Sequence, residues 1–206
     1  MRTSKKVMVG NVPVGGGSPI TVQSMLNIPA NRISDGVHQA KELADAGCEI
    51  LRAAIPDTDS VALIPAIKRE VSVPLVADIH FDYRLALKAA QAGADAIRIN
   101  PGNIGSDERV KAVADECLRR HIPIRIGVNS GSVQKDILAK YGGPTPRALA
   151  ESALLNASLL EKFGFSDIVL SIKSSDVRTM IEANRIVASK CSYPLHLGVT
   201  EAGTER

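Results

Sequence analysis

Four cationic side chains stand near the ends of short apolar segments in this 206-residue chain: Arg52, Arg98, Arg125 and Lys173. An arginine guanidinium can bind two oxygens of one phosphate, and a lysine ammonium adds a point charge. Cations gathered in one place repel one another unless an anion lies between them. These residue types therefore predict a binding site for a phosphate-rich anion, and a diphosphate is the natural ligand.

Internal ion pairing is the alternative explanation for the arginines. The candidate acids are Asp78, Glu49 and Asp95. Such a pair can account for a single arginine, but too few inward-facing acids are available to neutralise all four cations together.

Other polar residues also lie at the ends of these short apolar segments. Asp78 and His80 are two residues apart, so they share one face of a strand, and His80 is a candidate hydrogen-bonding or acid/base group. A histidine held beside an aspartate as a plain polar contact is the alternative. Glu201 follows the last segment on a glycine-bearing loop and is a candidate proton donor, or else a solvated loop acid. Three further side chains complete the set: Asn100, Asn129 and Ser171.

The segments that carry these residues alternate with helical patterns, which is typical of βαβ units and a parallel sheet. We expect strands at residues 20–24, 49–55, 74–79, 96–100, 123–129, 167–173 and 194–199. Proline and glycine take turns at their starts. The proline strands begin at Pro19, Pro74, Pro123 and Pro194, and the others follow a helix-ending glycine, at Gly47, Gly93 and Gly164.

This unbroken repeat predicts an α/β fold, a (β/α)8 TIM-type barrel truncated after its seventh strand. Residues 1–206 are then one incomplete domain. A doubly wound sheet is the competitor, but the repeat never reverses and no GxGxxG follows the first strand. In such barrels the chemistry gathers at the carboxyl ends of the strands, which is where the polar residues fall.

Composition excludes several classes of protein. Hydrophobic residues make up 45% and charged residues 23%, the balance of a globular protein. A formal net charge of +3 with 3% aromatic residues and no Trp argues against nucleic-acid binding. We find no signal peptide and no membrane span, and the three cysteines are widely spaced. We therefore expect a cytoplasmic protein with reduced thiols.

Several stretches together resemble one known family. These are VGNVPVGGGSPITVQSM, VPLVADIHFDYRLALKAAQAGADAIRINPGNIG, IPIRIGVNSGSVQKDILAKYGGPTP and PLHLGVTEAG. They are similar to the N-terminal barrel portion of 4-hydroxy-3-methylbut-2-enyl diphosphate synthase, the IspG or GcpE family. Members are iron–sulfur oxidoreductases of the non-mevalonate isoprenoid pathway, and they convert 2-C-methyl-D-erythritol 2,4-cyclodiphosphate by reductive ring opening.

The resemblance implies a role for each candidate residue. Arg52, Arg98, Arg125 and Lys173 would hold the diphosphate, and Glu201 would be the acid that assists loss of the hydroxyl. Asp78 and His80 would be further catalytic residues of the same mouth, and its remaining substrate-binding residues would be Asn100, Asn129 and Ser171. Electrons would come from flavodoxin or ferredoxin, and the full-length protein would be a homodimer.

Two departures from the family limit what the resemblance implies. Residues 27–33, NIPANRI, differ from the family's Thr- and Asp-rich stretch after the first strand. The family's 4Fe-4S cluster is held by three cysteines and a glutamate in a C-terminal domain with a CPxC pattern. Cys48, Cys117 and Cys191 do not match it, so we place no metal ligand in this chain. The fragment alone would bind the substrate without reducing it.

Two other functions stay open from the sequence. One is a redox-inactive module that keeps the diphosphate site. The other is a different barrel enzyme that acts on a phosphorylated or pterin substrate, such as a relative of dihydropteroate synthase.

Overall fold

A computed structural model describes residues 2–199 of the chain. The strands are β1 (Lys6–Val9), β2 (Val12–Gly15), β3 (Gln23–Met25), β4 (Ile50–Ala54), β5 (Leu75–Asp78), β6 (Ala96–Ile99), β7 (Ile124–Asn129), β8 (Ile168–Lys173) and β9 (Leu195–His196). The α-helices are α1 (Ile33–Asp45), α2 (Leu63–Glu70), α3 (Tyr83–Gln91), α4 (Pro101–Ile104), α5 (Asp107–Arg120), α6 (Lys135–Tyr141), α7 (Pro146–Lys162) and α8 (Val177–Lys190). Two 3-10 turns, η1 (Asp59–Ala62) and η2 (Ser130–Ser132), complete the order.

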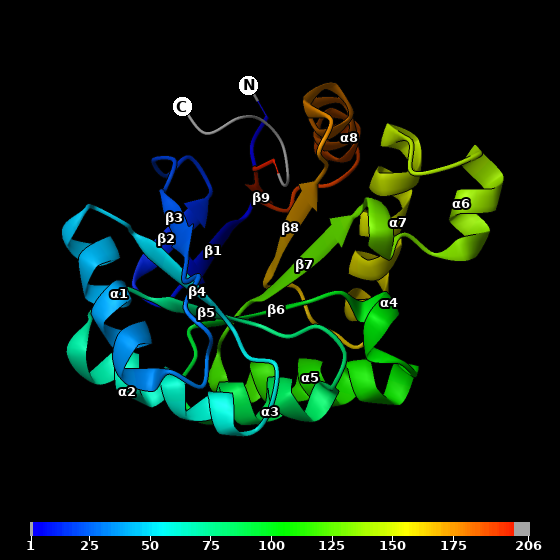
Figure 1. Ribbon diagram of the computed structural model, residues 1–206. Coiled ribbons are helices and arrows are strands. Elements are labelled where there is room, and N and C mark those ends of the chain that lie inside the picture. The colour runs from blue at the N-terminus through cyan, green and yellow to red at the C-terminus, as the bar shows by residue number, and fades with distance from the viewer. Residues whose placement is uncertain (1, 200–206) are drawn as a thin grey trace.

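Strands β3 to β9 form one parallel sheet in sequence order, which confirms the barrel class and the number and order of the predicted strands. The first and last differ from the predicted ranges 20–24 and 194–199, because only Gln23–Met25 and Leu195–His196 pair with a neighbouring strand. The sheet curls, and the long helices lie around its outer side (Figure 1). Residues alternate between the two faces, so Leu51 and Ala53 face the helices while Ile50 and Arg52 face the inside. The main core therefore lies between the sheet and the helices, where Leu51, Leu75 and Ile97 are fully buried.

Strands that begin after a glycine and strands that begin at a proline do so for different structural reasons. Gly47, Gly93 and Gly164 have φ of 91°, 99° and 74°, so each supplies the left-handed residue that ends a helix. The prolines lack an N–H, but their carbonyls still bond the neighbouring strand. Leu51 N donates to Pro74 O at 2.9 Å, and Ile97 N donates to Pro123 O at 3.1 Å.

Two acids of the glycine-type repeat accept hydrogen bonds from backbone N–H groups at the amino ends of the strands. Val22 N donates to Glu49 Oε2 at 2.7 Å, and Leu75 N donates to Asp95 Oδ2 at 2.8 Å. Lys68 also pairs with Asp95. Glu49 and Asp95 therefore lie at the end of the sheet opposite the predicted site, and neither is a partner for its arginines.

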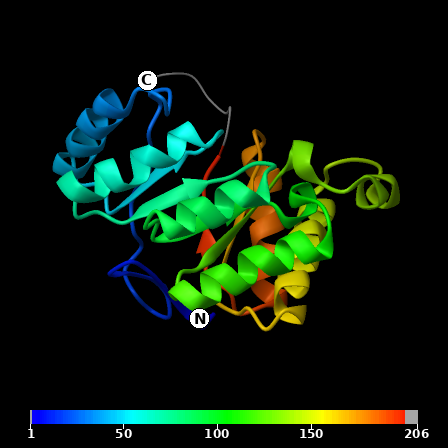
Figure 2. The same cartoon turned by 90° about the horizontal axis from the view of Figure 1, so that it is seen from below.

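An N-terminal hairpin is the part of the fold that the sequence prediction missed. Strands β1 and β2 pair antiparallel and lie at the amino end of the sheet, in dark blue in Figure 2. Val9 packs there with the inward residues Ile50, Val76 and Ala96 in a second, smaller core. The signal was present, since alternating valines flank the Gly10–Asn11 turn.

Replacing Gly93 with alanine tests the glycine repeat. A Cβ at this position would meet nothing within 4 Å, so the cost comes from φ of +99° alone. We expect a loss of about 1–2 kcal/mol of unfolding free energy in urea titrations. Gly131→Ala is the matched control, because Gly131 has an ordinary φ and an added Cβ would make only an ordinary contact, 3.7 Å from Asn129 Oδ1. Equal stability of the two variants would contradict this reason for the repeat.

No helix within residues 2–199 is long and apolar enough to cross a lipid bilayer.

Candidate functional site

The inner face of the curled sheet brings the four predicted cations together. Arg52, Arg98 and Lys173 lie toward the carboxyl ends of their strands, whereas Arg125 is the second residue of β7 and lies deeper inside than the sequence predicted. Register places Arg98 beside Asp78 on one side and beside Arg125 on the other. We call the resulting cluster the basic mouth and define it by five residues from β4 to β8: Arg52, Asp78, Arg98, Arg125 and Lys173.

Asp78 is the carboxylate at the centre of the basic mouth, with a side chain that is 1% exposed. Its Oδ2 accepts from Arg52 Nη2 at 2.5 Å and from Nε at 3.1 Å, and its Oδ1 accepts from Arg98 Nη1 at 3.0 Å. Burial alone would raise the pKa of this carboxyl, but the charges of Arg98 and Arg52 outweigh burial and hold the pKa below its usual value. Asp78 is therefore ionised at neutral pH and fixes two arginines at once.

Arg98 needs a glycine on the neighbouring strand. A Cβ built on Gly127 would overlap the Arg98 guanidinium at Nε, Nη2 and Cζ. Because Gly127 has no side chain, the Arg98 guanidinium has room to lie against β7. Burial lowers the pKa of Arg98, and Asp78 opposes that shift. The sequence analysis did not single out Gly127, although a glycine inside a strand is a known sign of close approach.

Arg125 is the most deeply buried cation of the mouth, with 3% of its surface exposed. Its Nη1 donates to Gln23 Oε1 on β3, and its buried Nε has no partner in the described part of the chain. Burial and the nearby charges of Arg52 and Arg98 lower its pKa to about 9, so it still carries its charge at pH 7. A buried charge without a direct carboxylate partner is costly unless a ligand compensates it.

Lys173 completes the charge of the mouth. Burial lowers its pKa first, and Arg52, Arg98 and Arg125 lower it further by repulsion. Four cations against one carboxylate leave a formal charge of +3 on the described residues of the mouth. The internal pairing that we considered as an alternative is real for Arg52 and Arg98, but within residues 2–199 it leaves Arg125 and Lys173 without a carboxylate partner.

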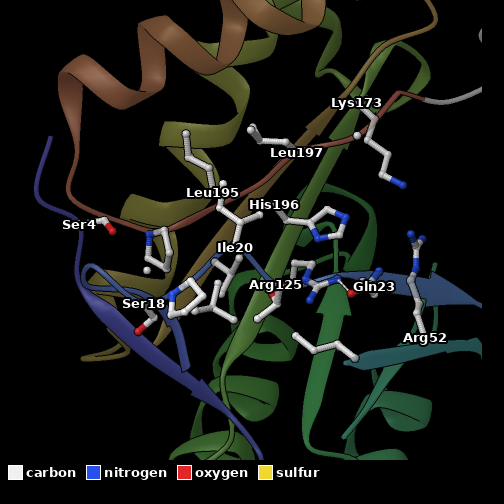
Figure 3. A pocket seen from close by; sticks show the side chains of 18 of the residues that line it. Ser4, Ser18, Ile20, Gln23, Arg52, Arg125, Lys173, Leu195, His196 and Leu197 are labelled. Carbon is white, nitrogen blue, oxygen red and sulfur yellow. Dashed lines mark hydrogen bonds between the residues drawn. The ribbon is translucent and has the colours of Figure 1, made fainter. Parts of the chain in front are cut away.

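A cavity of about 460 Å³ opens beside these residues, between β3 and β9. Figure 3 shows Arg52 and Lys173 with their nitrogen ends turned toward the same space, and the ring of His196 between Lys173 and Arg125. The rest of the labelled wall includes three apolar side chains, Ile20, Leu195 and Leu197, beside the polar Ser4, Ser18 and Gln23. Cations on one side and apolar side chains on the other suit an organic anion.

The histidine and serine candidates differ in exposure. His80 Nε2 lies 3.5 Å from Asp78 Oδ2, and its side chain is 55% exposed at the rim of the mouth. Ser171 is 5% exposed on the inner face of β8, beside His196 of β9 in the register.

The two asparagine candidates serve the backbone that surrounds the mouth. Asn100 is 2% exposed and begins α4, where its Oδ1 accepts from Gly102 N at 3.0 Å. Asn129 begins η2 and accepts from Gly131 N at 3.1 Å. Its backbone pairs with Lys173 across β7 and β8. Both side-chain oxygens are therefore already engaged in shaping the loops after their strands.

The predicted proton donor and the three cysteines remain to be placed. Glu201 lies outside the described residues. Cys48 and Cys117 are buried, Cys191 is half-buried, and all three are free thiols on different parts of the fold. Within residues 2–199, no three His, Cys, Asp or Glu side chains are grouped so that they could hold a metal ion. The described cysteines do not fit an iron–sulfur cluster.

Fold and site together define a β/α barrel protein with a cationic pocket on the inner face of its sheet. Residues 4–206 match the family model described as the GcpE TIM-barrel domain, and the chain belongs to this family.

Curated relatives carry one consistent name. The chain is 57% identical over 203 residues to the 4-hydroxy-3-methylbut-2-en-1-yl diphosphate synthase (flavodoxin) of Clostridium perfringens, covering 98% of this chain and 58% of that protein. It is 53% identical to the synthase of the same name from Caldanaerobacter subterraneus, over 98% of this chain and 57% of that protein. The chain thus spans little more than half the length of these relatives.

Solved structures share the fold at low identity. A phospho-2-dehydro-3-deoxyheptonate aldolase from Thermotoga maritima has a TM-score of 0.65 at 16% identity, over 93% of this chain and 54% of its own. A dihydropteroate synthase from Xanthomonas albilineans has a TM-score of 0.59 at 12% identity, over 94% of this chain and 91% of its own. The likeness to a pterin enzyme is therefore one of architecture only.

Proposed function

We propose that this chain is the substrate-binding barrel of a flavodoxin-dependent 4-hydroxy-3-methylbut-2-en-1-yl diphosphate synthase. Its ligand is the cyclic diphosphate 2-C-methyl-D-erythritol 2,4-cyclodiphosphate. The observation that carries the proposal is the uncompensated charge of the basic mouth, above all Arg125, which is 3% exposed and has no direct carboxylate partner among the described residues.

The cations divide into two groups. Arg52, Arg125 and Lys173 line the cavity, so we assign them to the diphosphate oxygens. Arg98 lies against Gly127 and pairs with Asp78, so its remaining N–H groups complete the anion site from behind. A guanidinium presents five N–H donors, and Asp78 engages only one of those of Arg98.

Asp78 has a positioning role in this proposal and is not a proton donor. Its pKa is held below the usual range by two arginines, so it has no proton to give at neutral pH. His80 at the exposed rim is the group that can contact the outer part of the ligand. Asn100 and Asn129 hold the loops, and Ser171 contributes a hydroxyl to the inner wall.

Reduction needs groups that the described residues do not supply. The resemblance implies a 4Fe-4S cluster that delivers electrons from flavodoxin, and Cys48, Cys117 and Cys191 do not form a site for it. We assign the cluster ligands to another part of a longer, homodimeric protein and Glu201 to protonation of the leaving hydroxyl. Three free thiols agree with a reducing, cytoplasmic location.

Calorimetry with the cyclic diphosphate tests the proposal. We expect the complete protein to bind it, and Lys173→Met to weaken binding by about 1.5–3 kcal/mol, the scale of a charge-assisted hydrogen bond. Lys111→Met is the matched control, because Lys111 lies exposed on α5 and pairs only with Asp115 among the described residues. A folded protein that shows no binding would overturn the assignment.

Turnover separates the enzyme from the redox-inactive module. If the complete protein binds the cyclic diphosphate but does not convert it in the presence of reduced flavodoxin, the result would support a binding function and contradict synthase activity.

A further inference from the structure

His196 lines the cavity beside the basic mouth, and none of the roles described above involves it. It lies on β9, and its backbone pairs with Ser171 of β8, so its side chain faces inward with the polar residues of β8. Figure 3 shows the imidazole in the cavity between Lys173 and Arg125.

Four strands, β4, β6, β7 and β8, each contribute a cation whose charge acts on this histidine. Asp78 of β5, the one acid in the described part of the basic mouth, is paired with Arg52 and Arg98. Burial and repulsion by Arg125, Lys173, Arg52 and Arg98 lower the pKa of His196 to about 3. The imidazole is therefore neutral in the free mouth at pH 7.

A bound diphosphate weakens this repulsion. Its negative charges offset part of the positive charge that keeps a proton away from the ring, and its oxygens can accept a hydrogen bond from a protonated ring. Arginine cannot respond in this way, because it is charged before and after binding. A histidine can change its charge to match the occupancy of the site.

We propose that His196 is a further binding residue of the mouth, which takes up one proton from solvent when the diphosphate binds and then hydrogen-bonds an oxygen of the ligand. The proposal rests on the proposed anion-binding function of the mouth. It makes binding dependent on pH with a definite sign.

The sign follows from linkage between proton and ligand. A group that gains protons on binding strengthens binding as the pH falls. If the ring regains an ordinary pKa of about 6.5 in the complex, affinity should rise by about tenfold from pH 8 to pH 5.5. The cyclic diphosphate is a good probe because both of its phosphates are esterified. It lacks the second phosphate ionisation, near pH 6, that belongs to monoesters.

Calorimetry of the complete protein tests this at pH 6.5 in two buffers of different ionisation enthalpy. We expect the wild type to take up about half a proton or more per ligand bound, and His196→Gln to lack this uptake and the tenfold rise. Lys173, Arg125 and the exposed His80 are present in both proteins, so their protons cancel in the difference. Equal uptake by both proteins would overturn the role of His196 while leaving the anion site intact, whereas absence of binding would overturn both.

A second measurement does not depend on the variant's folding. The ¹³Cε1 resonance of His196 in the wild-type protein should report a neutral ring at pH 6 without ligand and a protonated ring at saturation. A ring that stays neutral in the saturated protein would exclude proton uptake at this residue.

Discussion

Replacing Asp78 with asparagine is expected to lower the free energy of unfolding of the complete protein by about 3–5 kcal/mol, the range for removing one partner of a buried ion pair. The side chain is 1% exposed and accepts hydrogen bonds from Arg52 and Arg98. Without its charge, both guanidinium groups stay buried, and the described mouth gains a further positive charge. Urea titration monitored by circular dichroism would measure the loss.

Asp35→Asn provides the comparison. Asp35 also accepts a hydrogen bond from an arginine, Arg32, but its side chain is 47% exposed at the start of α1. Exposed pairs contribute at most about 1 kcal/mol, so this variant should be nearly as stable as the wild type. If Asp78→Asn costs no more than Asp35→Asn, Asp78 does not organise the mouth.

Replacing Gly127 with alanine should weaken binding of the cyclic diphosphate by about 10- to 150-fold, equivalent to one charge-assisted hydrogen bond of 1.5–3 kcal/mol. A single methyl group has this effect because it would occupy the space of the Arg98 guanidinium. Arg98 must then leave its position between β7 and Asp78. Calorimetry would measure the affinity.

The double variant distinguishes displacement of Arg98 from general damage. If Gly127 acts through Arg98, adding Gly127→Ala to Arg98→Ala should cost little more than Arg98→Ala alone. Additive losses would show that the alanine disturbs binding by another route.

The repeat of the chain predicted the barrel well because each start signal has a local physical cause. Proline and the helix-ending glycine act through their own φ angles, and Gly47, Gly93 and Gly164 adopt the positive φ that their places in the repeat imply. The hairpin of β1 and β2 was missed because it lies outside that repeat.

The candidate site was less predictable because it depends on contacts between strands. Alternation along each strand placed the cations on one face, but it could not show that Arg52 and Arg98 share Asp78 while Arg125 does not. The space that Gly127 leaves for Arg98 depends on the register of β6 against β7. His196 was passed over because a lone histidine in a strand gives no signal until four cations surround it.

A crystal structure of the complete protein with the cyclic diphosphate would show whether the basic mouth binds the diphosphate. We expect diphosphate oxygens within hydrogen-bonding distance, about 3 Å, of the guanidinium of Arg125 and of Lys173 Nζ, with Asp78 still paired to Arg52 and Arg98. A diphosphate bound away from the carboxyl ends of β4 to β8, with Arg125 left unpartnered, would contradict it.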